Sequence, residues 1–303
     1  MDETFGVRLK VELAGFTASS AWLQFTAKQV LEGFCNGLHR SPHKGSSVAF
    51  KQHRPYVSGD EIRRLDWKVF ARSDRFYIRE YEEETNLRAN LLVDGSGSMD
   101  YRGSRALMSK GEYARVLAAI FTQLLIQQQD GVGLVTFDTQ IREFIPVRSR
   151  PGHLNVITEA LALASVGGET ALGEVIEEVT RRIAPRGLVV LFSDCFGEVE
   201  DLVRVLGALR HAHHEVVVFQ VMDPDEVDFP FDVWSRFESL EDATDQVNAE
   251  PAAVRRLYLE NLRRFEEGLK SGLSRNRVEL VPVTTDMVPG KVFGEFLTRR
   301  MRA

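Results

Sequence analysis

The chain has 303 residues and a formal net charge of −6, with the composition of an ordinary soluble protein. This length allows one large domain, or one domain with a substantial extension, and it is sufficient to bury a sizeable core. The acidic balance argues against a general nucleic-acid binder, and no apolar run approaches the ~20 residues that span a bilayer. Because the N-terminus carries acids where a signal peptide has its basic region, we expect a cytoplasmic protein.

The first 86 residues are expected to form a helix and a β-rich extension. Hydroxyl residues followed by spaced apolar positions predict an amphipathic helix over 19–38. Turn-forming Pro and Gly residues come next, and β-rich segments are expected around Phe70 and over 76–81. A cluster of arginines and acids around a tryptophan in this extension serves either as structural ion pairing or as a docking surface for a partner protein. The candidate docking residues are Arg54, Arg63, Arg64 and Trp67.

From residue 87 to residue 303 the pattern changes to alternating strands and helices. Strands are expected over 86–94, 132–138, 141–147, 187–194, 215–223 and 277–283. Helices are expected over 110–129, 153–164, 171–183, 199–209, 251–272 and 292–301, with an irregular stretch after Pro224. The third strand follows the second with almost no connection, so these two should pair antiparallel. Six strands with helical crossovers predict an α/β fold with a doubly wound, mostly parallel sheet.

Five oxygen-bearing residues in three separate stretches predict a metal site. Two aspartates each follow a buried strand, and a threonine opens a helix in the loop between them. In a doubly wound sheet, the carboxyl ends of the strands lie at one edge, so the three stretches can converge there. Carboxylate and hydroxyl oxygens suit a small hard cation, Mg²⁺ or else Mn²⁺ or Ca²⁺. The predicted ligands are Asp94, Ser96, Ser98, Thr170 and Asp194.

The motifs DGSGSM, GGET and LFSD, in this order, resemble the three-part metal-ion-dependent adhesion site of von Willebrand factor A domains. In that family the serines and the threonine coordinate the cation, the aspartates often act through water, and a carboxylate of the partner completes the shell. The resemblance implies these roles for the five residues named above and covers residues 87–303. It departs from the family at Cys195, where a small residue often follows the last aspartate.

A second resemblance covers most of the chain. The stretch from HRSPHKG to REYEEETN, together with KGEYARVLAAIF and QQQDGVGLVTFD, resembles the bacterial family called "domain of unknown function 58". Many members carry N-terminal membrane helices, and this chain looks like the short soluble branch. Members accompany MoxR-type AAA+ ATPases, so the resemblance implies such an ATPase as the partner.

Three functions remain open on the sequence alone, and a divalent-cation-dependent protein-binding adaptor is the first. The second is a metal-dependent phosphohydrolase, which needs a second acid two residues after its aspartate, where this chain has Ser96. The motifs of P-loop NTPases and of G-x-S-x-G serine hydrolases are absent, so we expect no enzymatic activity. The third is a scaffold that carries a passive cation.

Overall fold

The computed structural model describes residues 19–37, 49–57, 67–73, 75–82, 87–168, 170–232, 235–238, 240 and 246–301. The chain divides into two compact units. The main unit joins helix α2 (Ser20–Gly37) to residues 87–303, and the small unit comprises residues 38–86. Within the described ranges, no helix is both long and apolar enough to cross a membrane.

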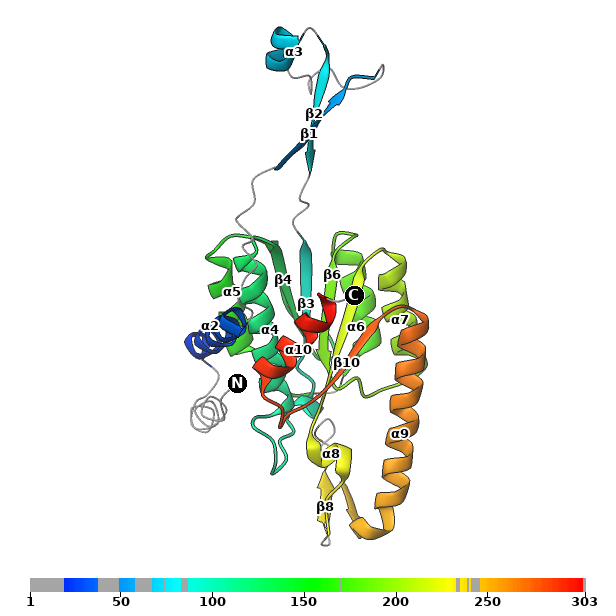
Figure 1. Cartoon of the computed structure of the whole chain (residues 1–303). Coiled ribbons are helices and arrows are strands. Elements are labelled where there is room, and N and C mark those ends of the chain that lie inside the picture. Colours follow the sequence, from blue (N-terminus) through cyan, green and yellow to red (C-terminus); the bar gives the residue numbers. More distant parts are fainter. Residues whose placement is uncertain are drawn as a thin grey trace. The chain divides into compact units, whose positions relative to one another are not determined.

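The main unit is built on a six-stranded sheet, shown in Figure 1. Its strands are β3 (Arg88–Asp94), β4 (Gly131–Phe137), β5 (Ile141–Arg148), β6 (Leu188–Ser193), β7 (Glu215–Met222) and β10 (Glu279–Thr284). They lie in the order β10-β7-β6-β3-β4-β5, and only β5 runs antiparallel, against β4. Numbered along the chain, this is the doubly wound order 3-2-1-4-5-6. The predicted fold class and the antiparallel third strand are therefore confirmed.

Helices cover both faces of the sheet (Figure 1). One face carries α4 (Lys110–Gln127), α5 (His153–Leu163) and α10 (Pro289–Arg300), and the other carries α6 (Leu172–Arg182), α7 (Val199–His211) and α9 (Pro251–Arg275). Helix α2 packs against α4 and α5, with Leu23 and Ala27 fully buried. The N-terminal helix was expected to belong to an extension over residues 1–86. In the structure it is part of the main unit, because its apolar face completes the core beside α4.

A cluster of phenylalanines forms the centre of the core on the α4 face. Phe121 of α4 meets Phe192 of β6, Phe219 of β7, and Phe293 and Phe296 of α10, with ring centroids 4.9 to 5.8 Å apart. The rings are mostly edge-on or tilted, the arrangement that aromatic quadrupoles favour. This packing fixes α4 on the sheet, and the first turn of α4 lies at the carboxyl edge of the strands.

Two stretches differ from the sequence expectations. Residues around Phe70 form helix α3 (Trp67–Ser73) rather than a strand, because the helical spacing brings Trp67 and Phe70 together, 6.1 Å apart edge to face. Beside it in the small unit, β1 (Ala49–Pro55) pairs antiparallel with β2 (Tyr77–Glu82), as expected for residues 76–81.

The stretch after Pro224, expected to be irregular, contains helix α8 (Pro224–Asp228) and a pair of antiparallel strands, β8 (Ser235–Glu238) and β9 (Gln246–Ala249). Helix α8 begins with a capping box in which the side chain of Asp223 and that of Glu226 each satisfy a backbone N–H at the helix start. This cap places Glu226 directly after β7, at the carboxyl edge of the sheet.

Candidate metal centre

The two predicted aspartate ligands emerge from neighbouring strands. Strands β3 and β6 pair in parallel with Val93 opposite Phe192, so Asp94 and Asp194 leave the sheet at the same edge. Both carboxylates are buried, with only 2% of each residue exposed. The hydroxyl of Ser193 donates a 2.6 Å hydrogen bond to Oδ2 of Asp94 and thereby connects the two strand ends.

The loop after β3 turns its two serines toward each other. The backbone N–H of Ser96 donates to Oδ1 of Asp94 at 2.9 Å, and Oγ of Ser96 lies 3.1 Å from Oγ of Ser98. A short 3₁₀ helix, η2 (Gly97–Asp100), carries Ser98. The structure therefore brings Asp94, Ser96 and Ser98 together as the sequence predicts. The two serine hydroxyl oxygens are close enough to bind the same cation.

The loop that carries Thr170 is held against this first loop by backbone hydrogen bonds. The N–H of Gly97 donates to the carbonyl of Gly168 at 2.8 Å, and the N–H of Gly167 donates to the carbonyl of Gly95 at 2.9 Å. The backbones approach closely, since a Cβ on Gly97 would lie 3.2 Å from the Gly168 oxygen. Glycine allows this contact, which brings the stretch that carries Thr170 to the same edge of the sheet.

Thr170 supplies the observation that points most directly to a ligand. Its hydroxyl oxygen is buried and has no hydrogen-bond partner in the part of the chain that the structure describes. Only four buried side-chain atoms among the described residues share this property, so the case is uncommon in this chain. A buried hydroxyl without a partner costs free energy, and a coordinated cation would satisfy it.

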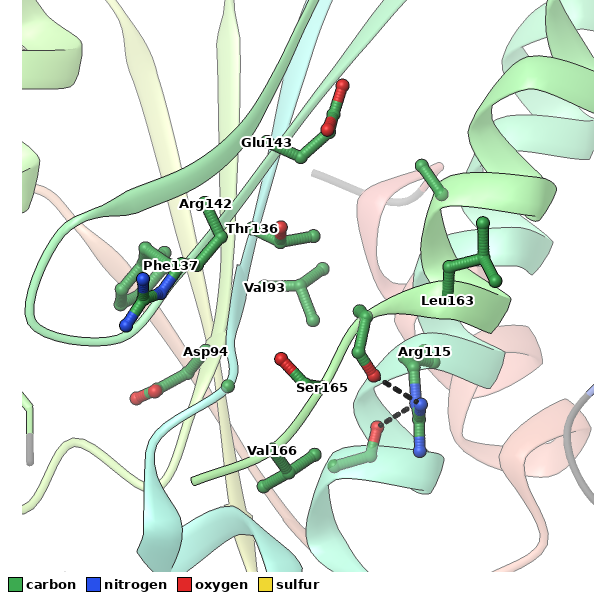
Figure 2. Close-up of a pocket in the computed structure, with 14 residues that line it drawn as sticks. Val93, Asp94, Arg115, Thr136, Phe137, Arg142, Glu143, Leu163, Ser165 and Val166 are labelled. Carbon is green, nitrogen blue, oxygen red and sulfur yellow. Dashed lines mark hydrogen bonds between the residues drawn. The ribbon is translucent and has the colours of Figure 1, made fainter. Parts of the chain in front are cut away.

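A cavity of about 220 Å³ lies beside the centre, between the ends of β3 and β4 and helices α4 and α5 (Figure 2). Figure 2 shows Arg115 of α4 bonded to two carbonyl oxygens. Its Nη1 donates to Ala164 at 3.0 Å and its Nε donates to Gly111 at 3.3 Å. Burial lowers the pKa of Arg115. This arginine fastens the end of α5, from which the Thr170 loop departs.

A buried lysine lies at the same edge and was not predicted. The ammonium of Lys110 donates to Oδ2 of Asp194 at 2.8 Å and to Oε1 of Glu226 at 2.6 Å, and the lysine side chain is fully buried. Burial alone would lower the pKa of Lys110, but the charges of Asp194 and Glu226 outweigh it and raise the pKa. Burial also raises the pKa of Glu226.

The electrostatics at Asp94 fit a cation. Burial and, second, the negative charge of Asp194 raise the pKa of Asp94 to about 6. Ionised carboxylates are costly in such surroundings unless a positive charge compensates them. The carboxylates, the serine pair and the hydroxyl of Thr170 are oxygen donors of the kind that small hard cations prefer. No group of three or more His, Cys, Asp or Glu side chains arranged for a metal occurs among the described residues. Three of the five predicted ligands, Ser96, Ser98 and Thr170, are hydroxyl residues.

The predicted docking residues are only partly described. Arg54 lies in β1, opposite Ile78 of β2, and Trp67 begins α3 with 57% of its surface exposed. Arg63 and Arg64 lie outside the described residues. These positions belong to the small unit.

Sequence reasoning missed Lys110 and Glu226. One indication was available, because Lys110 is the first residue of α4, directly after the cap Ser109. A positive charge is disfavoured at a helix N-terminus, so a lysine there suggests an acidic partner. Glu226 carries a comparable indication, since Asp223-Pro-Asp-Glu226 has the spacing of a capping box.

Comparison with known proteins identifies the family. The model of the family described as "Protein of unknown function DUF58" matches residues 52–267, which is more than half of the chain. Uncharacterized proteins of Mycobacterium tuberculosis and Mycobacterium bovis are 30% identical over 211 residues, covering 69% of this chain. The chain spans 65% of the length of these relatives. The chain belongs to the DUF58 family.

Several solved structures resemble the chain. The conserved hypothetical protein BatB from Bacteroides thetaiotaomicron aligns with a TM-score of 0.47 and 16% identity, over 72% of this chain and 100% of that one. The SpRpn10 VWA domain aligns with a TM-score of 0.40 and 9% identity, over 68% and 94% of the two chains.

Proposed function

We propose that this chain is a divalent-cation-dependent protein-binding adaptor, with a MoxR-type AAA+ ATPase as its partner. The observation that carries the proposal is the convergence of hard oxygen donors at one sheet edge, including a Thr170 hydroxyl without a partner in the described chain. The ligands would be Asp94, Ser96, Ser98, Thr170 and Asp194, and the cation Mg²⁺, or else Mn²⁺ or Ca²⁺. When bound, the cation would supply a positive centre that attracts a carboxylate of the partner.

The chain's own residues prepare this centre. Ser193 and the N–H of Ser96 hold one carboxylate oxygen each of Asp94, so the side chain is already oriented. The N–H of Phe196 holds Oδ1 of Asp194 at 3.2 Å. An oriented donor set reduces the entropy lost when a ligand binds. The ATPase part of the proposal rests on family membership, and the cytoplasmic location belongs to the same proposal.

We propose binding rather than hydrolysis of phosphate esters for a local reason. Hydrolysis by an aspartate after a first strand requires a second acid two residues later to protonate the leaving group. That position is Ser96, whose hydroxyl lies against Ser98 and whose N–H is bonded to Asp94.

The experiment is co-purification of the ATPase from source-cell lysate with tagged protein, in Mg²⁺ and in EDTA. The variant Asp94→Asn keeps the shape of the side chain and removes its charge. Asp138→Asn is the matched control, because Asp138 is also a buried aspartate at a strand end but pairs with Arg142 at 2.5 Å. We expect capture by wild type and Asp138→Asn in Mg²⁺, and loss of capture in EDTA or with Asp94→Asn. Equal capture by Asp94→Asn would remove the metal centre from the interface.

A further inference from the structure

We propose that Lys110 is a resident counter-cation of the metal centre. Its ammonium holds the carboxylates of Asp194 and Glu226 together when no divalent cation is bound, and it lowers the affinity of the centre for divalent cations. This inference rests on the proposed function, because it concerns how the same centre takes up its cation.

The position of Lys110 is unfavourable for a lysine in two independent ways. The side chain is fully buried, and an ammonium removed from water is costly unless it is paired. Lys110 is also the first residue of α4, where the helix dipole disfavours positive charge. An apolar residue would avoid both costs, so the contacts of the ammonium must account for the lysine.

Those contacts connect two elements of the carboxyl edge. Asp194 follows β6 and uses Oδ2 for Lys110 and Oδ1 for the N–H of Phe196. Glu226 lies in α8 and uses Oε1 for Lys110 and Oε2 for the N–H of Asp223, at 2.8 Å. The ammonium also lies 5.2 Å from the ring centroid of Phe196. Each carboxylate is thus fixed on one side by backbone and on the other by Lys110.

The charges at this edge explain why the lysine matters for a divalent cation. Asp94 and Asp194 are predicted ligands, and Glu226 shares the ammonium with Asp194. The group made up of these three carboxylates and the ammonium of Lys110 carries two net negative charges, which one divalent cation would neutralise. Without Lys110, three negative charges would remain. The lysine therefore stabilises the cation-free centre and opposes the cation through like-charge repulsion.

This arrangement also fits the role proposed for the partner. A centre whose affinity for the cation is kept low binds it firmly only when another carboxylate joins. A partner's acidic residue would supply that charge, so cation uptake and partner binding would strengthen each other.

The test compares four variants with wild type by thermal unfolding in EDTA and in Mn²⁺, and by calorimetric titration with Mn²⁺. Lys110→Met removes the ammonium, and Glu226→Gln removes one carboxylate while keeping an oxygen for the N–H of Asp223. The double variant removes both charges. Lys291→Met is the control, because Lys291 is an exposed lysine with its ammonium 4.0 Å from the carboxylate of Glu295.

For Lys110→Met we expect a lower unfolding temperature in EDTA, recovery in Mn²⁺, and Mn²⁺ affinity at least about tenfold tighter than wild type. Glu226→Gln should shift the affinity in the opposite direction. The double variant should recover part of the stability in EDTA, because it restores the net charge of the wild-type group although Asp194 has lost its pairing with Lys110. Lys291→Met should match wild type in both measurements.

An unchanged or weaker Mn²⁺ affinity in Lys110→Met would overturn the inference while leaving the metal centre intact. A double variant as unstable in EDTA as Lys110→Met would also overturn the inference, because the excess negative charge would then not be the cause of the instability. The comparison of these two variants remains valid if Lys110→Met does not fold in EDTA. Failure of wild type and every variant to bind Mn²⁺ would instead refute the proposed metal centre itself, and with it the inference.

Discussion

Replacement of Thr170 by valine should raise the stability of the cation-free protein and lower the stability of the cation-bound protein. Valine has nearly the same shape as threonine and lacks the hydroxyl. Because that hydroxyl is buried and has no partner in the described chain, its removal should stabilise the cation-free protein. The cost of an unsatisfied hydroxyl is about 1 kcal/mol at the lower end of mutational data, which corresponds to a rise of roughly 2–4 °C in unfolding temperature.

With the cation present, the expectation reverses. A ligand that binds only the folded protein adds about 2.7 kcal/mol of stability at a concentration of one hundred times its Kd. Thr170→Val loses one of the predicted ligands, so it should lose most of this gain and become less stable than wild type. Differential scanning calorimetry in EDTA and in Mg²⁺ measures both states of each protein.

The matched control is Thr122→Val in α4. Thr122 is fully buried, but its hydroxyl donates a 2.8 Å hydrogen bond to the carbonyl of Ala118. Its replacement should lower stability by about 1 kcal/mol with or without cation. If Thr170→Val behaved in the same way, or raised the unfolding temperature equally in EDTA and in Mg²⁺, then Thr170 would not be a ligand of the cation.

Three further predictions concern the loop, the core and pH. Gly97→Ala should lower the free energy of unfolding by about 1–3 kcal/mol and weaken Mn²⁺ binding, because a Cβ there would lie 2.1 Å from the Leu240 carbonyl oxygen. A Gly97→Ala variant that matched wild type in urea unfolding and in Mn²⁺ titration would disprove this. Phe121→Ala should cost about 3–5 kcal/mol in urea unfolding, and a loss below about 1 kcal/mol would show that the aromatic cluster is not central. Burial lowers the pKa of His153 below 6.5, because the folded protein favours the neutral imidazole. The contribution of this neutral imidazole to stability is therefore complete above pH 6.5 and is lost as the pH falls below that value. His153→Gln should therefore show a flatter pH dependence of the urea midpoint, and an identical profile would exclude this role.

Much of the main unit was predictable because its strands are continuous apolar runs that end in polar residues. The runs before Asp94 and Asp194 are typical of buried parallel strands, and the short connection from β4 to β5 favours antiparallel pairing. Once both strands were placed in a doubly wound sheet, the common edge of the two aspartates followed from topology.

The remainder depended on contacts that local patterns do not specify. Aromatic and β-branched residues around Phe70 favour a strand, but Phe70 lies on helix α3 and stacks on Phe76, which directly precedes β2, with ring centroids 4.4 Å apart. Lys110 is 84 residues from Asp194 and 116 from Glu226 in the chain, so no local pattern could predict these pairs. Their cause is the packing of α4 across β6 and β7.

Calorimetric titration of Mn²⁺ into the full chain, for wild type and Asp94→Asn, tests the metal centre most directly. We expect wild type to bind one cation per chain. Asp94→Asn should lose that binding while its thermal unfolding in EDTA remains cooperative. Absence of binding to wild type at millimolar Mn²⁺, or equal binding by a folded Asp94→Asn variant, would contradict the assignment of the metal centre.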